Sequence, residues 1–294
     1  LWEVVHCSVL ADHLEEAGDH HLEVVFLTII TEDMEDITLR ARRVLSEVDF
    51  VACEDSRVGG KLMLLLGLKK PLYAYHEHNK QRAGEVIAER IAAGEDCALI
   101  TDAGTPAVSD PGEDLVRLCR SRGIEVVPLP GACAAVTALS ASGLPSRRFC
   151  FEGFLPEDGL KEYLEPLSRE KRTMIFYSAP HDLIKTLKTL YDAFGDRNAA
   201  LCKELTKLNE RITQKKLSEH IADCESAESI RGEYVIVVEG YTHRDEDEFW
   251  YGMTPEQHVE HYRALGLSDM DAIKQTARDR GVPKGAIYGL IKKG

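Results

Sequence analysis

Residues 97–112 read Cys-Ala-Leu-Ile-Thr-Asp-Ala-Gly-Thr-Pro-Ala-Val-Ser-Asp-Pro-Gly. The apolar start, Cys97–Thr101, predicts a short buried strand, and residues 102–112 are dense in small, turn-forming and acidic side chains. Because ligands of open α/β sheets bind at the carboxyl ends of the strands, we expect this loop to approach a ligand closely. A plainer interpretation is a tight turn in which Asp110 caps a helix whose first residue is Pro111.

On both sides of this stretch, short apolar runs alternate with amphipathic segments. The other runs that predict buried strands of the same sheet are Leu22–Ile30, Phe50–Cys53, Leu72–Tyr75 and Ile124–Pro128. The segment after the first run has apolar residues at helical spacing, namely Ile37, Ala41, Val44, Leu45 and Val48. Gly94 and Gly123 stand where helix C-caps are expected. The alternation predicts an α/β domain with a mostly parallel sheet over residues 22–145.

A second set of apolar runs follows the loop at Gly143 and Pro145. Its predicted strands are Phe149–Phe151, Thr173–Tyr177, Ala199–Cys202 and Tyr234–Val238. They predict a second domain of α/β or α+β type over residues 146–240. The charged stretch 242–248 is typical of a linker. Beyond it, short helical patterns predict a small helical module at 254–294.

The acidic residues are concentrated at one end of the chain. The 294 residues have a net charge of -14, and residues 1–36 hold ten acidic side chains and no Lys or Arg. The other 258 residues therefore carry -4, which is -14 minus -10. We treat residues 1–21 as an atypical acidic N-terminal segment. This distribution of charge neither demands nor excludes RNA as a partner.

Composition argues against export and against a membrane protein. Hydrophobic residues make up 44% of the chain, yet no apolar run approaches the roughly 20 residues that a membrane span needs. The first twenty residues lack the basic start of a secretory signal. The eight cysteines include no C-x-x-C pair, which disfavours a zinc ribbon or a disulfide framework. We therefore expect a cytoplasmic protein without a metal site.

Several common ligand motifs are missing. No G-x-G occurs, so neither the dinucleotide fingerprint nor a Walker A loop is present. His258 and His261 lie three residues apart, but their segment predicts a polar face of a surface helix rather than a metal site.

Polar clusters also follow other predicted strands. Residues 54–57 read Glu-Asp-Ser-Arg and residues 76–79 read His-Glu-His-Asn, and both offer acid, base and hydrogen-bonding groups. Residues 128–135 enter a predicted helix through small residues, which suits either backbone contact with a ligand or tight helix packing.

Taken together and in order, these motifs resemble the bacterial ribosomal RNA small subunit methyltransferase I family of the tetrapyrrole methylase superfamily. The resemblance covers about 36–240, with a looser match beyond. The segments that carry it are 52–57, 75–79, 102–112, 139–145, 151–156 and Glu204-Leu205-Thr206-Lys207.

The resemblance implies a class III methyltransferase fold, in which two α/β domains hold S-adenosylmethionine in the cleft between them. It implies methylation of the ribose 2'-hydroxyl of a cytidine in the decoding region of 16S ribosomal RNA, by a homodimer. We expect neither DNA nor a membrane as a partner. The residues that it places at the cofactor are Asp102, Gly104, Thr105, Gly131, Ala132, Cys133, Ala134 and Tyr177.

The chemistry suggests further candidates. A ribose hydroxyl is a poor nucleophile until its proton leaves, so a base within about 3 Å would help. The candidates for this catalytic role are Asp55, His76, Glu77 and Lys203. For RNA contacts we expect Arg57 as a phosphate clamp, together with His78 and Asn79.

Two departures from the family keep alternatives open. Its first loop reads Thr-Pro-Ile-Gly-Asn-Leu-Glu-Asp, whereas this chain has Ile30 for the proline and Glu32 for the glycine. One alternative is therefore a catalytically silent relative that binds ribosomal RNA during subunit assembly. Another is a methyltransferase acting on a tetrapyrrole, a corrinoid or, as in diphthine synthesis, a modified protein histidine.

Overall fold

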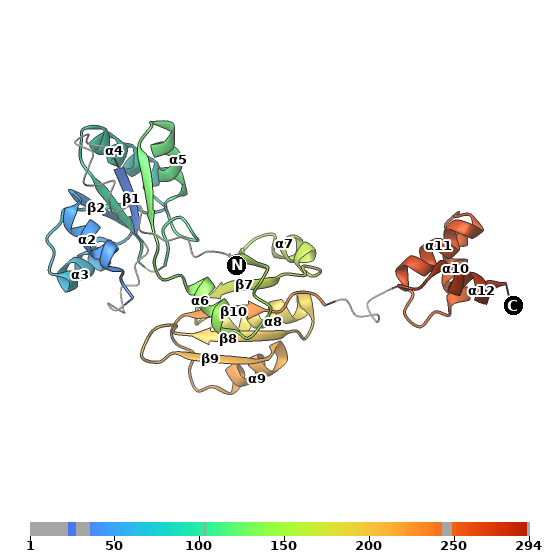
Figure 1. Ribbon diagram of the computed structural model, residues 1–294. Helices are drawn as coiled ribbons and strands as arrows, with labels where there is room; N and C mark the ends of the chain where they lie inside the picture. Colours follow the sequence, from blue (N-terminus) through green and yellow to red (C-terminus); the bar gives the residue numbers. More distant parts are fainter. Residues whose placement is uncertain (1–22, 28–35, 103, 243–248, 293–294) are drawn as a thin grey trace. The chain divides into compact units, whose positions relative to one another are not determined.

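The computed structural model describes residues 23–27, 36–102, 104–242 and 249–292, which fall into two compact units, residues 1–240 and 241–294 (Figure 1). The first unit contains two five-stranded sheets, and the second contains only helices among its described residues. The acidic segment 1–21 and almost all of the predicted linker, 243–248, lie outside the described residues.

The first sheet is parallel throughout, in the order β3-β2-β4-β1-β5. Its elements are β1 (Glu23–Leu27), α2 (Leu39–Glu47), β2 (Phe50–Cys53), α3 (Ser56–Leu66), β3 (Leu72–Ala74), α4 (Lys80–Ala92), β4 (Cys97–Ile100), α5 (Glu113–Ser121) and β5 (Glu125–Leu129). The central position of β4, between β1 and β2, brings its following loop to the middle of the sheet's carboxyl edge.

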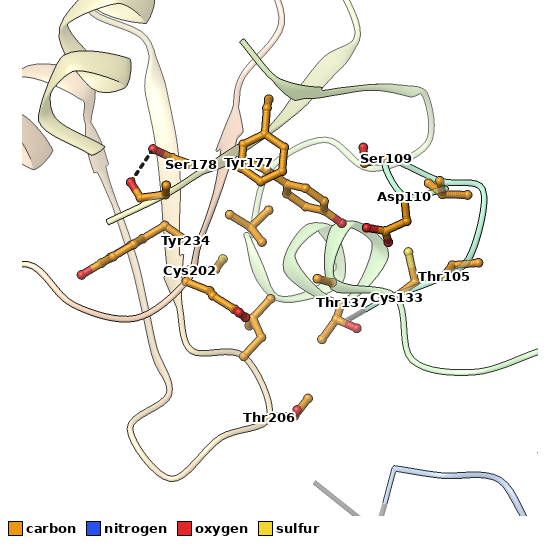
Figure 2. A pocket seen from close by; sticks show the side chains of 18 of the residues that line it. Thr105, Ser109, Asp110, Cys133, Thr137, Tyr177, Ser178, Cys202, Thr206 and Tyr234 are labelled. Atoms are coloured by element: carbon orange, nitrogen blue, oxygen red, sulfur yellow. Dashed lines mark hydrogen bonds between the residues drawn. The ribbon is translucent and has the colours of Figure 1, made fainter. Parts of the chain in front are cut away.

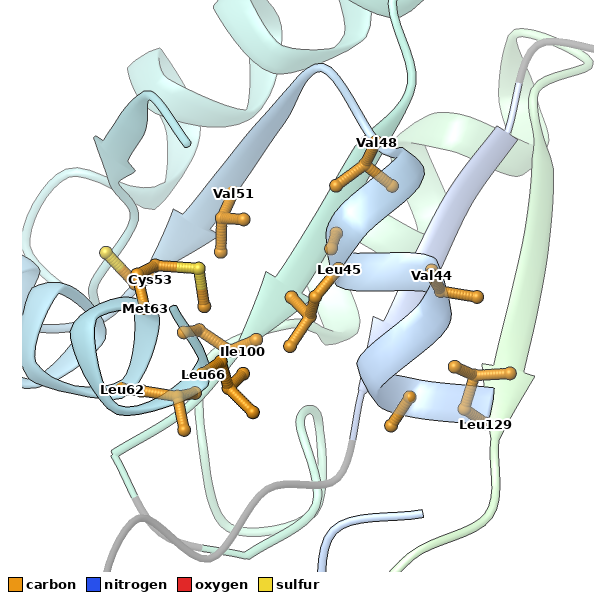
Figure 3. Packing of buried hydrophobic residues seen from close by; sticks show 12 residues of the cluster. Val44, Leu45, Val48, Val51, Cys53, Leu62, Met63, Leu66, Ile100 and Leu129 are labelled. Atoms are coloured by element: carbon orange, nitrogen blue, oxygen red, sulfur yellow. The ribbon is translucent and has the colours of Figure 1, made fainter. Parts of the chain in front are cut away.

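Helices cover both faces of this sheet, and the alternation along β2 shows how. Val51 and Cys53 pack with α2 and α3, as Figure 3 shows, whereas Phe50 and Ala52 pack with α4 and α5. All four side chains of β2 are buried, which explains why its sequence is a continuous apolar run.

Capping residues close in sequence set the ends of the helices. For example, Asp55 caps α3 by accepting the Arg57 amide at 2.7 Å.

The second sheet is mixed, in the order β6-β7-β10-β8-β9. β6 and β7 are parallel, while β10 is antiparallel to both β7 and β8. The elements are α6 (Ala134–Ala141), β6 (Phe149–Phe154), α7 (Leu160–Leu167), β7 (Thr173–Ser178), α8 (Leu183–Phe194), β8 (Asn198–Lys203), β9 (Arg211–Lys216), α9 (Leu217–Ser226) and β10 (Tyr234–Val238). Helices α7, α8 and α9 cover one face, and α6 packs on the other.

The predicted fold class is confirmed, and the predicted strands match the observed ones to within a few residues. The sequence missed β9, because Arg-Ile-Thr-Gln-Lys-Lys is too polar to stand out as a buried strand. Among the described strands β9 pairs with β8 alone, so it is an edge strand, and an edge strand tolerates such charges well. No helix among the described residues is long and apolar enough to cross a membrane.

The second unit is a bundle of α10 (Pro255–Ala264), α11 (Asp269–Asp279) and α12 (Lys284–Ile291). Thr254 and Ser268 cap α10 and α11 through their hydroxyl groups. A small apolar core joins the three helices, and its fully buried members are Val259, Ala272, Ile273, Ala277 and Ile287.

The prediction of a polar surface for His258 was wrong, because its side chain is fully buried. The ring stacks on Trp250, with centroids 5.5 Å apart, and Arg280 Nε donates to its Nδ1 at 3.1 Å. The ring's Nε2 lies 3.2 Å from Oδ2 of Asp279, which also accepts the Tyr262 hydroxyl at 2.6 Å. Burial first, and then the Arg280 charge, lower the pKa of His258. Because Nδ1 accepts from Arg280, the ring proton is on Nε2.

Replacing Asp279 with alanine should destabilise this helical unit by about 2 kcal/mol, because the Tyr262 hydroxyl loses its acceptor and the buried His258 ring loses its charged neighbour. The fluorescence of Trp250 during urea unfolding of the full chain measures this, with Trp2→Phe in the background so that one indole remains. Asp269→Ala is the control, since Asp269 is exposed and forms a surface ion pair with Arg263. Equal midpoints for the two variants would show that the network contributes nothing.

Candidate active site

The loop between β4 and α5 holds its shape through unusual backbone geometry. Gly104, Ala107 and Ser109 all have positive φ, at 84°, 66° and 64°. A Cβ at Gly112 would lie 2.9 Å from the Ala107 nitrogen, so only glycine permits this close approach. Strain of this kind is concentrated in loops that position functional groups.

The plainer interpretation of this loop was wrong in one respect. Gly112, not Asp110, is the N-cap of α5, which begins at Glu113. The Asp110 side chain therefore does not cap α5.

A cavity of about 320 Å³ lies against this loop. Its other walls are the start of α6, the carboxyl ends of β7 and β8, and the beginning of β10. Figure 2 shows side chains from these elements converging on the cavity. Most of the lining is apolar, contributed by Val108, Ala134, Phe154, Ala179, Leu205 and Val235. An apolar cavity with few polar groups is typical of small-molecule sites.

Asp110 is the principal acidic group of the cavity. Burial raises the pKa of Asp110 to about 7, and repulsion from Glu54 and Asp102 adds to the effect. The Tyr177 hydroxyl points toward Asp110 in Figure 2, and burial raises the pKa of Tyr177 to about 12. Asp110 is thus a half-buried carboxyl that a cationic ligand group would hold in its charged form.

The opposite wall is the loop 204–207. Glu204 and Thr206 have positive φ, at 50° and 65°. Glu204 Oε1 accepts the Glu233 amide at 2.8 Å, and a Cβ at Gly232 would lie 2.6 Å from the Glu204 side chain, so this loop is tightly fixed. Oγ1 of Thr206 is buried without a hydrogen-bond partner among the described residues. A hydroxyl in that state at a cavity wall suits a polar ligand atom.

The predicted cofactor residues divide into two groups. Gly104, Thr105, Cys133, Ala134 and Tyr177 line the cavity. Asp102, Gly131 and Ala132 do not line it; Asp102 instead accepts the Asp55 amide at 3.2 Å. Their assignment to the cofactor stays a prediction.

The predicted catalytic and RNA-contacting residues lie outside the cavity lining. Asp55 and Arg57 form a bidentate ion pair with each other, and the Arg57 hydrogen bonds hold the pKa of Asp55 near 2. Asp55 is therefore a poor base. Arg57 remains highly exposed.

The turn after β3 contains the other predicted polar residues. Asn79 closes it, since Oδ1 accepts the His76 amide at 2.9 Å and Nδ2 donates to Ala74 at 3.0 Å. Glu77 is exposed and pairs with Lys80 at 2.6 Å. His78 is exposed, with its ring centroid 6.0 Å from that of His76.

His76 differs from its neighbours, because its Nδ1 is buried without a hydrogen-bond partner among the described residues. It lies close enough to Glu54 to lower that carboxyl's pKa, although burial and Asp102 raise it overall. His76 thus belongs to the same polar group as Glu54, Asp102 and Asp110, at the carboxyl ends of β2, β3 and β4.

Lys203 is not brought to the cavity. It ends β8 next to Cys202, and Cys202 faces the cavity while Lys203 lines a separate hollow. Successive side chains of a strand point to opposite faces, which accounts for the difference.

Sequence reasoning missed Asp110, Thr206 and Val235 as lining residues. A signal was available for the first two, because both lie in motifs that carried the family resemblance. Nothing in the local sequence marks Val235, which reads as an ordinary residue of a buried strand. The departures Ile30 and Glu32 lie outside the described residues.

The fold and the cavity agree with comparisons to known proteins. The family model of tetrapyrrole (corrin/porphyrin) methylases matches residues 31–221, so the chain belongs to the tetrapyrrole methylase family. A solved structure of diphthine synthase superimposes with a TM-score of 0.60 at 14% identity, covering 76% of this chain and 91% of that one. At that identity the likeness concerns the fold.

Two curated relatives place the chain more narrowly. The ribosomal RNA small subunit methyltransferase I of Halalkalibacterium halodurans is 44% identical, over 88% of this chain and 90% of that protein. The protein of the same name from Bacillus subtilis is 43% identical, over 87% of this chain and 89% of that protein. Within the tetrapyrrole methylases, the chain belongs to the ribosomal RNA small subunit methyltransferase I family, as its motifs predicted.

Proposed function

We propose that this protein is an S-adenosylmethionine-dependent methyltransferase that modifies ribosomal RNA of the small subunit. The observation that carries the proposal is the cavity at the carboxyl edge of the first sheet, in a chain of this family. In its finer form the proposal is 2'-O-methylation of a cytidine in the decoding region, by a cytoplasmic homodimer. Exposed Leu64 and Leu65 on α3 offer an apolar surface for the dimer.

The residues of the cavity suit S-adenosylmethionine. That molecule carries a positively charged sulfonium, an ammonium and an adenine ring. Asp110 would hold a cationic group, the apolar walls would take the ring, and the Thr206 hydroxyl would meet a polar atom. When bound, S-adenosylmethionine supplies a methyl group that is already activated for displacement.

The protein must position the ribose and accept the proton of its hydroxyl group. Because the methyl group is activated, most of the rate comes from holding the ribose oxygen in line with it. Of the four predicted bases, Asp55 is weak because Arg57 lowers its pKa to about 2, Glu77 pairs with Lys80, and Lys203 lines another hollow. His76 fits best, because it lies near Glu54 at the carboxyl ends of β2 and β3. The imidazole of His76 would accept the hydroxyl proton.

The test is methyl transfer from labelled S-adenosylmethionine to small ribosomal subunits that lack the modification. We expect transfer to unmodified subunits and none to modified ones. His76→Gln should lower kcat about thirtyfold, while calorimetric affinity for the cofactor stays within about twofold.

The other outcomes of this experiment would favour one of the alternatives or exclude a residue's role. Cofactor binding without transfer would favour the silent relative, and transfer only to a tetrapyrrole, a corrinoid or a modified protein histidine would favour the other alternative. Unchanged kcat in His76→Gln would exclude His76 as the base and leave the methyltransferase proposal intact.

A further inference from the structure

A second hollow lies on the other side of the loop 204–207. We call it the basic hollow, because three cationic side chains line it. Its lining residues are Lys203, Glu204, Asn209, Glu210, Arg211, Arg231 and Gly232. The cavity described above is bounded by Leu205, Thr206 and Lys207 of the same loop, so this one loop separates the two spaces.

The two carboxylates of the basic hollow are engaged with other groups. Glu204 accepts the Glu233 amide and pairs with Lys207 at 3.4 Å. Glu210 Oε2 accepts the Thr206 amide at 2.7 Å. Within the part of the chain that the structure describes, no carboxylate forms an ion pair with Lys203, Arg211 or Arg231. Three cations against two carboxylates, one of which pairs with Lys207, leave the hollow with a net positive charge.

Strand register brings these charges together. Lys203 at the end of β8 pairs directly with Arg211 at the start of β9. Lys203 is also opposite Tyr234 of β10, and Arg231 lies just before that strand. Like charges directly across an antiparallel pair destabilise a sheet. A bound anion would remove this repulsion.

We infer that the basic hollow binds a phosphate of the RNA strand whose ribose enters the neighbouring cavity. The inference rests on the proposed function. An arginine fork binds two phosphate oxygens at once, and a phosphodiester is attached directly to the ribose that carries the reacting hydroxyl. A phosphate held beside the loop 204–207 would thus position that hydroxyl. Lys203 becomes a positioning residue instead of a base.

The same domain offers a matched control. A distal hollow of similar chemistry is lined by Arg148, Arg169, Lys171 and Arg172, with Pro166 and Glu170. It lies at the start of β7, whereas the cavity and the basic hollow lie near the ends of β7 and β8. Removing two arginines from the distal hollow therefore changes the net charge as much as removing two from the basic hollow, but at the opposite end of the sheet.

The experiment measures binding of the full-length protein to a synthetic RNA of the decoding region, by fluorescence anisotropy at several salt concentrations. Arg211→Gln with Arg231→Gln should weaken binding about tenfold and lower the slope of log K against log salt by about one. Arg148→Gln with Arg169→Gln should stay within about twofold of the unaltered protein. Arg211→Lys with Arg231→Lys should restore most of the affinity. Calorimetry with S-adenosylmethionine should give the same affinity for all variants.

Equal losses in the two glutamine pairs would overturn the inference, because only net charge would then matter. So would an unchanged affinity in Arg211→Gln with Arg231→Gln. The proposed function survives both results, since it depends on methylation by the unaltered protein. An unaltered protein that neither binds nor methylates the RNA would overturn both. If the glutamine pair loses its fold or its cofactor affinity, Arg231→Gln alone gives the same comparison against Arg169→Gln.

Discussion

Replacing Asp110 with asparagine is expected to weaken binding of S-adenosylmethionine about a hundredfold at pH 8. The carboxylate is the half-buried acidic group that lines the cavity beside Tyr177, and a charge-assisted hydrogen bond in such a place contributes roughly 1.5–3 kcal/mol. Calorimetric titration of the full-length protein measures the change. Glu113→Gln is the control, because Glu113 is exposed and pairs with Arg117 at the start of α5.

The pH dependence separates this role from a purely structural one. The pKa of Asp110 is about 7, so the carboxyl is mostly neutral at pH 6 and mostly charged at pH 8. Affinity for a cationic ligand should therefore rise about tenfold across that range in the unaltered protein, and much less in Asp110→Asn. Any titration of the ligand itself affects both proteins equally, so the comparison isolates the contribution of Asp110. Parallel pH profiles would contradict the assignment.

The same substitution should stabilise the free protein at high pH. Because the folded-state pKa of Asp110 is raised above the usual value of 3.8, the folded protein holds a proton that the unfolded chain has released. Stability is thus lost as pH rises from about 4 to 7 and stays low above 7. At pH 8 we expect Asp110→Asn to be more stable by roughly 1–2 kcal/mol, since half-burial leaves part of the group in water. A loss of stability would instead mark Asp110 as a structural residue.

Gly240→Ala is expected to lower the free energy of unfolding of the first unit by about 4 kcal/mol. Gly240 lies just after β10, and an added Cβ would be 2.2 Å from the carbonyl oxygen of Lys171 and 2.7 Å from that of Arg172. Both atoms belong to backbone that leads into β7, so neither can move without shifting a central strand. Urea unfolding followed by far-UV circular dichroism measures the loss.

Gly60→Ala is the matched control for this prediction. Gly60 lies within α3, and a Cβ there would meet only the Leu72 side chain, at an ordinary distance of 3.6 Å. Removing a helix-interior glycine should leave stability unchanged or raise it by up to about 1 kcal/mol. If Gly240→Ala unfolds at the same urea concentration as Gly60→Ala, the contact with Lys171 is not a constraint.

Sequence motifs predicted only part of the candidate site. Gly104, Thr105, Cys133, Ala134 and Tyr177 were assigned to the cofactor from the family resemblance, and the structure brings them to one cavity. Asp55, Glu77 and Asn79 belong to equally recognisable motifs, yet their side chains form local ion pairs or close a turn. A motif shows that residues matter, but it does not separate ligand contacts from the contacts that shape a turn.

The sequence by itself determined the two α/β domains, the helical module and the family, because apolar periodicity, turn residues and long motifs are local properties of the chain. Only the tertiary structure decided the roles of Asp110, Lys203 and His258. Asp110 acquires its raised pKa from burial and from carboxylates on other loops, Lys203 points away from the cavity through strand alternation, and His258 is buried by residues distant in sequence. Burial, electrostatic neighbours and side-chain direction depend on which segments meet in space, and no single segment encodes that.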